Sequence, residues 1–143
     1  MNEHIADLSA MDREKFLEFL LWHYRVVDAF WFIRTEENFG LEEAEKLNEQ
    51  VWGKAAELAA KDIKRRFGVK EDGLQGFLKA FKYFPWTMIV GYDIRQTSEE
   101  VVLRVFDCPS QNARIRRGLG EYACKMMHWG ESVSYTHLRA HET

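Results

Sequence analysis

The sequence predicts an α+β protein in which a helical N-terminal half precedes a β-hairpin and two further helices. Apolar residues recur at helical spacing through roughly the first 84 positions, after which β-branched and aromatic residues gather in two short runs around a polar turn. A hydrophobic content of 46% is enough to build a core, and an aromatic content of 14% argues against disorder. These two observations define the expected class.

The first helix is expected to begin near Asp12 and to end near Asn38, just before Gly40. Its apolar positions are spread so widely around the helix that they predict burial on more than one side. A second helix opens with a group of acidic residues, which favour a helix N-terminus, and is expected to end at Gly68. Its alanines allow another helix to approach closely.

A third, shorter helix is expected over residues 74–84, with Asp72 as its cap and Pro85 as its stop. Residues 86–95 and 101–106 then have the composition of two strands joined by the polar turn QTSEE. The period of the pattern therefore changes from helix to hairpin near residue 86.

A short helix over residues 110–117 is expected to follow the hairpin, because Pro109 suits the first position of a helix. Two glycines then form a joint, and a last helix is expected from Glu121 onwards. Cys108 therefore stands at a junction between a strand and a helix.

The C-terminal residues 133–143 are expected to be artefactual. Their sequence, VSYTHLRAHET, is the translation of a widely used transposon-adapter oligonucleotide in one reading frame, with a match at every position. Such a segment is set aside before the fold is considered, so His137 and His141 are excluded from any site. The sequence thus predicts a single α+β domain over residues 1–132 that is truncated at its C-terminus.

Charge and cysteine content limit the partners and the compartment. A net charge of −3 gives no reason to expect a nucleic-acid partner. The most apolar stretch, residues 16–33, is interrupted by charged residues and predicts a core helix rather than a membrane span, so no membrane partner is expected. Two cysteines without a secretory signal predict a reduced, cytoplasmic location. The oligomeric state is left open.

Cys108 is the first candidate for chemistry. A thiol at a helix N-terminus lies at the positive end of the helix dipole, which favours the reactive thiolate form. Cys108 is therefore a candidate nucleophile or ligand. The alternative is a small buried cysteine that only packs at the turn.

The residues after Cys108 supply further candidates. Gln111 and Arg114 share a helix face, and Arg114 can clamp a substrate carboxylate with two hydrogen bonds or else lie on a solvated basic face. Glu121, Cys124 and His128 are spaced to share a face of the last predicted helix. A carboxylate, a thiol and an imidazole so arranged predict either a base with a nucleophile or an incomplete metal site.

Asp28 is a candidate binding residue on the first helix, together with Trp31, which can line a pocket. A carboxylate among large apolar residues needs a polar partner, and Arg25 one turn earlier is expected to supply it. The sequence has no Gly-rich phosphate loop, GxSxG or HExxH motif, so no cofactor can be named.

Taken together, these residues resemble a group of uncharacterised prokaryotic proteins related to the L-2-amino-thiazoline-4-carboxylic acid hydrolase family. The resemblance covers most of residues 17–128. Its most specific part is the segment from Cys108 to Lys125, whereas the helical half matches by pattern at Asp28, Trp31, Phe32, Glu37, Phe39, Gly40 and Trp52.

The resemblance implies hydrolysis of a C–N bond in a small cyclic amidine. Cys108 would then act as nucleophile or polariser, Glu121 as the acid/base and Arg114 as the carboxylate clamp, with Cys124 nearby. The alternative is a sensor module that binds a small molecule or a metal without catalysis. The resemblance also implies further C-terminal strands, whose loss would leave a sheet edge unpaired.

Overall fold

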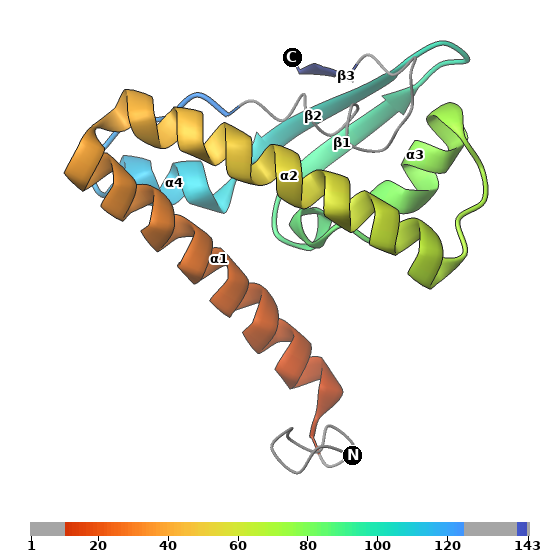
Figure 1. The fold of residues 1–143 in the computed structure, drawn as a ribbon, viewed down its shortest axis with the longest axis horizontal. Coiled ribbons are helices and arrows are strands. Elements are labelled where there is room, and N and C mark those ends of the chain that lie inside the picture. Colours follow the sequence, from red (N-terminus) through yellow and green to blue (C-terminus); the bar gives the residue numbers. More distant parts are fainter. Residues whose placement is uncertain (1–10, 125–139, 143) are drawn as a thin grey trace.

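The structure, a computed structural model, describes residues 11–124 and the backbone of 140–142 (Figure 1). Its elements are α1 (Arg13–Phe39), α2 (Leu41–Phe67), α3 (Gly73–Phe81), the 3₁₀ helix η2 (Pro85–Met88), β1 (Gly91–Gln96), β2 (Val101–Asp107), α4 (Pro109–Arg116) and β3 (Ala140–Glu142). The predicted α+β class is confirmed, with helices first, then an antiparallel hairpin and then a helix.

The limits predicted for the two long helices are confirmed. Asp12 caps α1 by accepting a hydrogen bond from the backbone N–H of Lys15 at 3.2 Å. Gly40 lies between α1 and α2 with a φ of 88°, a backbone conformation that residues other than glycine rarely adopt. Because no other residue separates the helices, the chain reverses sharply, and α2 runs back at an acute angle to α1 (Figure 1).

The core lies where α2 and α3 meet the hairpin. Small side chains bring the helices together, since Ala60 and Ala80 are almost completely buried. Larger rings fill the remaining space. The buried cluster consists of Ala56, Ala60, Ile63, Phe77, Ala80, Phe81, Phe84 and Val101.

The segment around Pro85 differs from the expected helix and strand. α3 ends at Phe81, and Pro85 begins the short helix η2 instead of only stopping α3. The Thr87 hydroxyl donates to the Phe84 carbonyl at 2.7 Å and holds this turn. β1 therefore begins at Gly91 rather than at residue 86, and the hairpin closes with Gln96 opposite Val101.

The prediction of a helix that begins at Glu121 is wrong for residues 121–124, which form no helix. Gly118 and Gly120 both have positive φ values, 71° and 73°, so the chain turns out of α4. Gln111 and Arg114 of α4 then donate hydrogen bonds to the carbonyls of Tyr122 and Gly120, groups that would accept backbone hydrogen bonds within a helix. Residues 125–139 lie outside the described part of the chain.

The sheet edge predicted to be unpaired is partly covered. β3 pairs in parallel with the first three residues of β2, Val101 to Leu103. β3 lies within residues 133–143, the segment that the sequence assigns to an adapter.

The prediction that α1 is buried on more than one side is wrong. Phe32 is the one buried residue of α1. The C-terminal half of α1 packs on α2, and Tyr24 contacts the Trp52 and Trp86 rings. The first turns of α1 extend beyond the other elements (Figure 1). None of the described helices combines the length and apolar character that a membrane span requires.

Candidate functional site

A cavity of about 170 Å³ lies between the C-terminal half of α1 and α4. Its lining comes from α1, from α4 and the residues that follow α4, and from Asn48 of α2. Much of its wall is apolar, with Phe30, Phe32 and Tyr122 as its rings. Its polar side chains are Arg25, Asp28, Asn48, Ser110, Arg114 and Arg117.

Asp28 is the carboxylate of this cavity. The Trp52 indole N–H donates to Asp28 Oδ1 at 3.1 Å. Burial raises the pKa of Asp28 to about 6, and the hydrogen bond from Trp52 opposes this rise. The partner expected from the sequence was Arg25, and that expectation is wrong, since Trp52 of α2 fills this role. Among the described residues, Trp52 is the one hydrogen-bond donor to this carboxylate, and it binds Oδ1 and not Oδ2.

Ser110 supplies an unpaired hydroxyl in the same cavity. Its Oγ is buried and has no hydrogen-bond partner among the described residues. Ser110 lies in the first turn of α4, whose first residue is Pro109, as the sequence predicts. A buried hydroxyl without a partner is uncommon in folded proteins.

Arg114 is the buried cation of α4. Its Nη1 and Nη2 donate to the two carboxylate oxygens of Glu36 at 2.5 and 3.0 Å, and its Nε donates to the Gly120 carbonyl at 3.0 Å. The pKa of Glu36 is lowered by these hydrogen bonds. The side chain predicted to clamp a substrate carboxylate thus clamps a carboxylate of α1 in this structure.

The segment after α4 is held against the cavity by side chains. Gln111 forms two hydrogen bonds with the backbone of Tyr122, at 2.9 and 3.1 Å. Glu45 of α2 accepts from the backbone N–H of Ala123 at 2.8 Å. The Tyr122 ring is thereby placed 4.5 Å from that of Phe32, measured between centroids.

The two cysteines lie near this segment. Cys108 caps α4 at the predicted strand–helix junction and is half-buried, without a capping hydrogen bond from its side chain. Cys124 is exposed. Burial raises the pKa of Tyr122, and negative charge on Cys124, Cys108 and Asp28 adds to the rise. Neither cysteine is among the residues that line the cavity.

Other predicted site residues lie elsewhere. Trp31 is 73% exposed and does not line the cavity. Glu121 is also exposed and is not part of the lining. His128 lies outside the described residues. Within the described part of the chain, no three His, Cys, Asp or Glu side chains are placed to hold a metal ion.

Glu36, Ser110 and Tyr122 were not identified as site residues in the sequence. Glu36 and Arg114 are 78 positions apart, and no local pattern joins them. Tyr122 looks like an ordinary core aromatic, and Ser110 looks like a common residue of a first helical turn. Trp52 was expected in the core or in the wall of a pocket, but its contact with Asp28 was not foreseen. The one available signal was the Gly-rich joint after α4, which shows that the chain can fold back on that helix.

Comparison with known proteins places the chain without assigning it an activity. No curated protein and no solved structure matches it. A family profile described as a family of unknown function, DUF6125, matches residues 9–139, which is most of the chain. The protein therefore belongs to this family of unknown function.

Proposed function

We propose that this protein binds a small molecule carrying both a carboxylate and a basic nitrogen in the cavity between α1 and α4. The observation that carries the proposal is Asp28, a carboxylate at a cavity wall whose Oδ2 lies outside its hydrogen bond with Trp52 and whose pKa is raised to about 6. Keeping such a group away from water is costly unless something compensates it. A ligand nitrogen that binds Oδ2 would supply that compensation.

The charges around Asp28 favour a second, anionic end on the ligand. Arg25 and Arg117 also line the cavity, and neither forms an ion pair with any described carboxylate. Arg114 is neutralised by Glu36. The cavity therefore carries two arginines without an ion pair among the described residues, beside one carboxylate with a raised pKa. This balance suits a carboxylate bound by arginine, which donates two parallel hydrogen bonds.

The size and wall of the cavity fit the same class of ligand. A space of about 170 Å³ holds a molecule the size of an amino acid rather than a nucleotide or a peptide. The apolar wall gives a ring or short aliphatic part of the ligand a surface to pack on. The ligand class is thus a small zwitterion or cyclic amidine acid.

The first test combines binding and stability of Asp28→Asn. Titration calorimetry with 2-aminothiazoline-4-carboxylate is expected to show at least about tenfold weaker binding, because the charged contact to the nitrogen is lost. In the wild type, affinity is expected to fall as the pH drops through 6 and Asp28 becomes protonated. Without ligand, the variant is expected to be about 1–2 kcal/mol more stable at pH 8.

The sign of the stability effect follows from the raised pKa. Because the pKa of Asp28 rises from 3.8 to about 6 on folding, the carboxyl favours the folded state fully below 3.8, and this contribution is lost as the pH rises through 6. Asparagine retains an oxygen for Trp52 but never ionises. Analogues lacking only the carboxylate or only the nitrogen serve as controls. Equal binding of all three compounds, or of none, would contradict the proposal.

A second candidate function is hydrolysis of a C–N bond in such a cyclic amidine. The observation that favours it is that Cys108 is the cap residue of α4 and directly precedes Pro109 and Ser110, which line the cavity, although Cys108 itself does not. In this reaction the Cys108 thiolate adds to the amidine carbon, and the ring C–N bond breaks as its nitrogen takes a proton. Water then displaces the thiolate, so that one water is consumed for each C–N bond broken.

The hydrolytic candidate is tested by chromatographic product analysis of the full chain incubated with 2-aminothiazoline-4-carboxylate. Cys108→Ser is expected to reduce turnover at least about 100-fold, since a hydroxyl is a far weaker nucleophile at neutral pH. Cys124→Ser is the matched control. Turnover that survives Cys108→Ser and vanishes in Cys124→Ser would reject Cys108 as the nucleophile, and absence of any product would leave binding as the function.

A further inference from the structure

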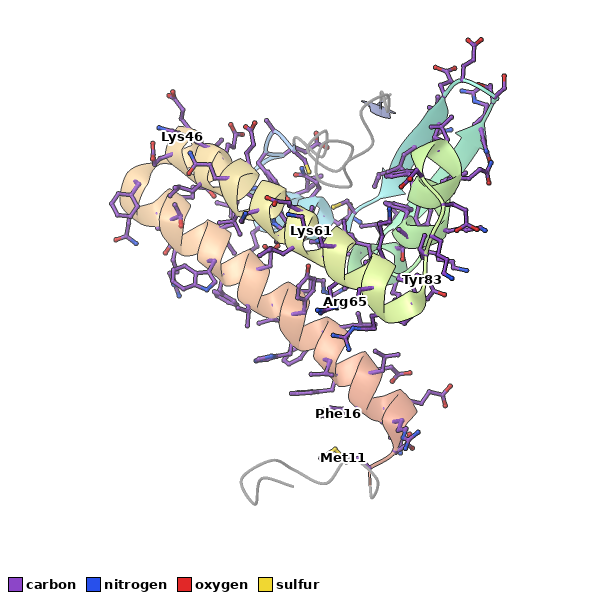
Figure 2. All side chains as sticks on the ribbon, turned by 45° about the vertical axis from the view of Figure 1, so that its right-hand side comes forward. Met11, Phe16, Lys46, Lys61, Arg65 and Tyr83 are labelled. Atoms are coloured by element: carbon purple, nitrogen blue, oxygen red, sulfur yellow. The ribbon has the colours of Figure 1, made fainter. Side chains whose placement is uncertain are left out.

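Trp52 lies behind the wall of the cavity and is not part of it. Asp28 is one of the lining residues, whereas Trp52 is not. The indole N–H of Trp52 nevertheless reaches from α2 to Asp28 Oδ1 of α1, at 3.1 Å. Figure 2 shows side chains of both helices in the space between them. An effect of Trp52 on a ligand in the cavity therefore passes through Asp28.

Three aromatic rings hold the Trp52 indole in place. Tyr24 of α1, Phe84 and Trp86 of η2 each meet it edge to face, with centroids 5.9, 6.3 and 5.4 Å away. Phe84 is itself buried in the core. Edge-to-face contacts fix the orientation of a ring as well as its distance. The direction of the indole N–H is thus set by α1, α2 and the segment around Pro85 together.

The chemistry of the indole decides which form of Asp28 it stabilises. An indole N–H donates a hydrogen bond and cannot accept one. Such a partner binds an ionised carboxylate more strongly than a neutral carboxyl group. Burial raises the pKa of Asp28 to about 6, and the hydrogen bond from Trp52 opposes this rise. Asp28 is therefore mostly an anion at neutral pH in spite of its burial.

The ionisable groups on the other elements around Asp28 leave this task to Trp52. Arg114 is paired with Glu36. Burial raises the pKa of the neighbouring tyrosines, which are uncharged at neutral pH. Within residues 11–124, none of these groups donates a hydrogen bond to the carboxylate. They are Tyr24 and Arg25 of α1, Arg114 of α4, Arg117 at its end and Tyr122 beyond it.

We propose that Trp52 positions Asp28 as a hydrogen-bond acceptor and thereby selects ligands whose nitrogen carries a positive charge. The inference rests on the ligand class proposed above and narrows it. A hydrogen bond between an ionised donor and a carboxylate is about twice as strong as a neutral one. A protonated amidine or ammonium group thus fits the site better than a neutral group of the same shape. Trp52 is a positioning residue, because it acts on the ligand only through Asp28.

The first experiment needs no ligand. The carboxyl carbon of Asp28 is followed by NMR in a pH titration of the full chain, and Asp28→Asn assigns its signal. The wild-type midpoint is expected at about 6. Trp52→Phe keeps an aromatic ring but lacks the N–H. This variant is expected to raise the midpoint by about one pH unit, because a hydrogen bond to the charged form is lost.

Trp86→Phe is the matched control. Trp86 contacts the Trp52 ring, but its own hydrogen bond is with Tyr24 and not with Asp28. The midpoint is expected to stay unchanged in this variant. Benzothienylalanine at position 52 keeps the shape of the indole with sulfur in place of the N–H, and it replaces Trp52→Phe if that variant does not fold. A midpoint that stays at the wild-type value without the N–H, or rises equally in Trp86→Phe, would overturn the inference.

The second experiment measures selection by calorimetry with 2-aminothiazoline-4-carboxylate and its analogue without the basic nitrogen. The pH at which affinity for the first compound falls is expected to move up in Trp52→Phe by the same interval as the NMR midpoint. The analogue is expected to show no such fall. Identical pH profiles in the wild type and Trp52→Phe would overturn selection by Trp52. Binding of neither compound, together with a raised NMR midpoint in Trp52→Phe, would reject the proposed ligand class alone.

Discussion

Replacing Arg114 with alanine is expected to lower the free energy of unfolding by about 3–5 kcal/mol, as for other broken buried ion pairs. The Arg114 side chain is 5% exposed, and its partner Glu36 is 20% exposed. Removing the guanidinium leaves the Glu36 carboxylate largely buried without a counter-charge. It also frees the Gly120 carbonyl, which Arg114 holds at 3.0 Å. Urea denaturation followed by circular dichroism measures the change.

The double variant with Glu36→Gln separates the ion pair from the packing of the arginine. If the pair is the cause, removing both charges costs less than the sum of the single changes. The pH dependence gives a second check. Since the pKa of Glu36 is lowered in the folded protein, its contribution is present above the usual value of 4.5 and is lost as the pH falls below it. A loss in Arg114→Ala that is unchanged at pH 3 would contradict this account.

Phe81→Ala is expected to cost about 3–5 kcal/mol, the usual loss for a buried ring in a rigid core. Phe81 is 4% exposed and stacks on Phe77 with centroids 5.4 Å apart. It also meets the edge of Tyr92 of β1 at 5.7 Å, so it joins α3 to the hairpin. The alanine variant leaves a cavity at this junction that the two neighbouring rings cannot fill.

Phe67→Ala is the matched control for this substitution. Phe67 stacks on Tyr83 with centroids 3.9 Å apart, but it is 48% exposed at the end of α2. Its loss is expected to be about 1 kcal/mol, because much of the ring never leaves water. Equal losses for the two variants in the same denaturation experiment would show that the α3–hairpin contact is not the centre of the core.

The long helices could be predicted because their signals are local. Asp12 marks a helix start because its side chain can cap the first turn, and Gly40 and Gly68 mark helix ends because glycine adopts positive φ values. The structure places the ends of the helices at these residues. The hairpin was predicted by composition, although Pro85 moved its first strand by a few residues. The segment after α4 could not be predicted, because its conformation depends on hydrogen bonds from Gln111 and Arg114 rather than on its own sequence.

The candidate site was predicted only in part. Cys108 was correctly placed at a strand–helix junction and Asp28 was correctly chosen as an unusual carboxylate, but the partner of Asp28 was not found. The ion pair of Glu36 with Arg114 and the contact of Trp52 with Asp28 join residues far apart in sequence. Such contacts depend on how α1, α2 and α4 pack on one another, and the spacing of apolar residues along the sequence does not determine this packing.

Phe30 holds two cations against its ring at the wall of the cavity. The Arg117 guanidinium lies over this ring at 5.8 Å, and Arg34, one turn further along α1, lies over it at 5.7 Å. With the proposed ligand, a carboxylate bound by Arg117 would meet a side chain that is already held in place. The entropy lost when that arginine is immobilised would then be smaller than for an arginine in open solvent.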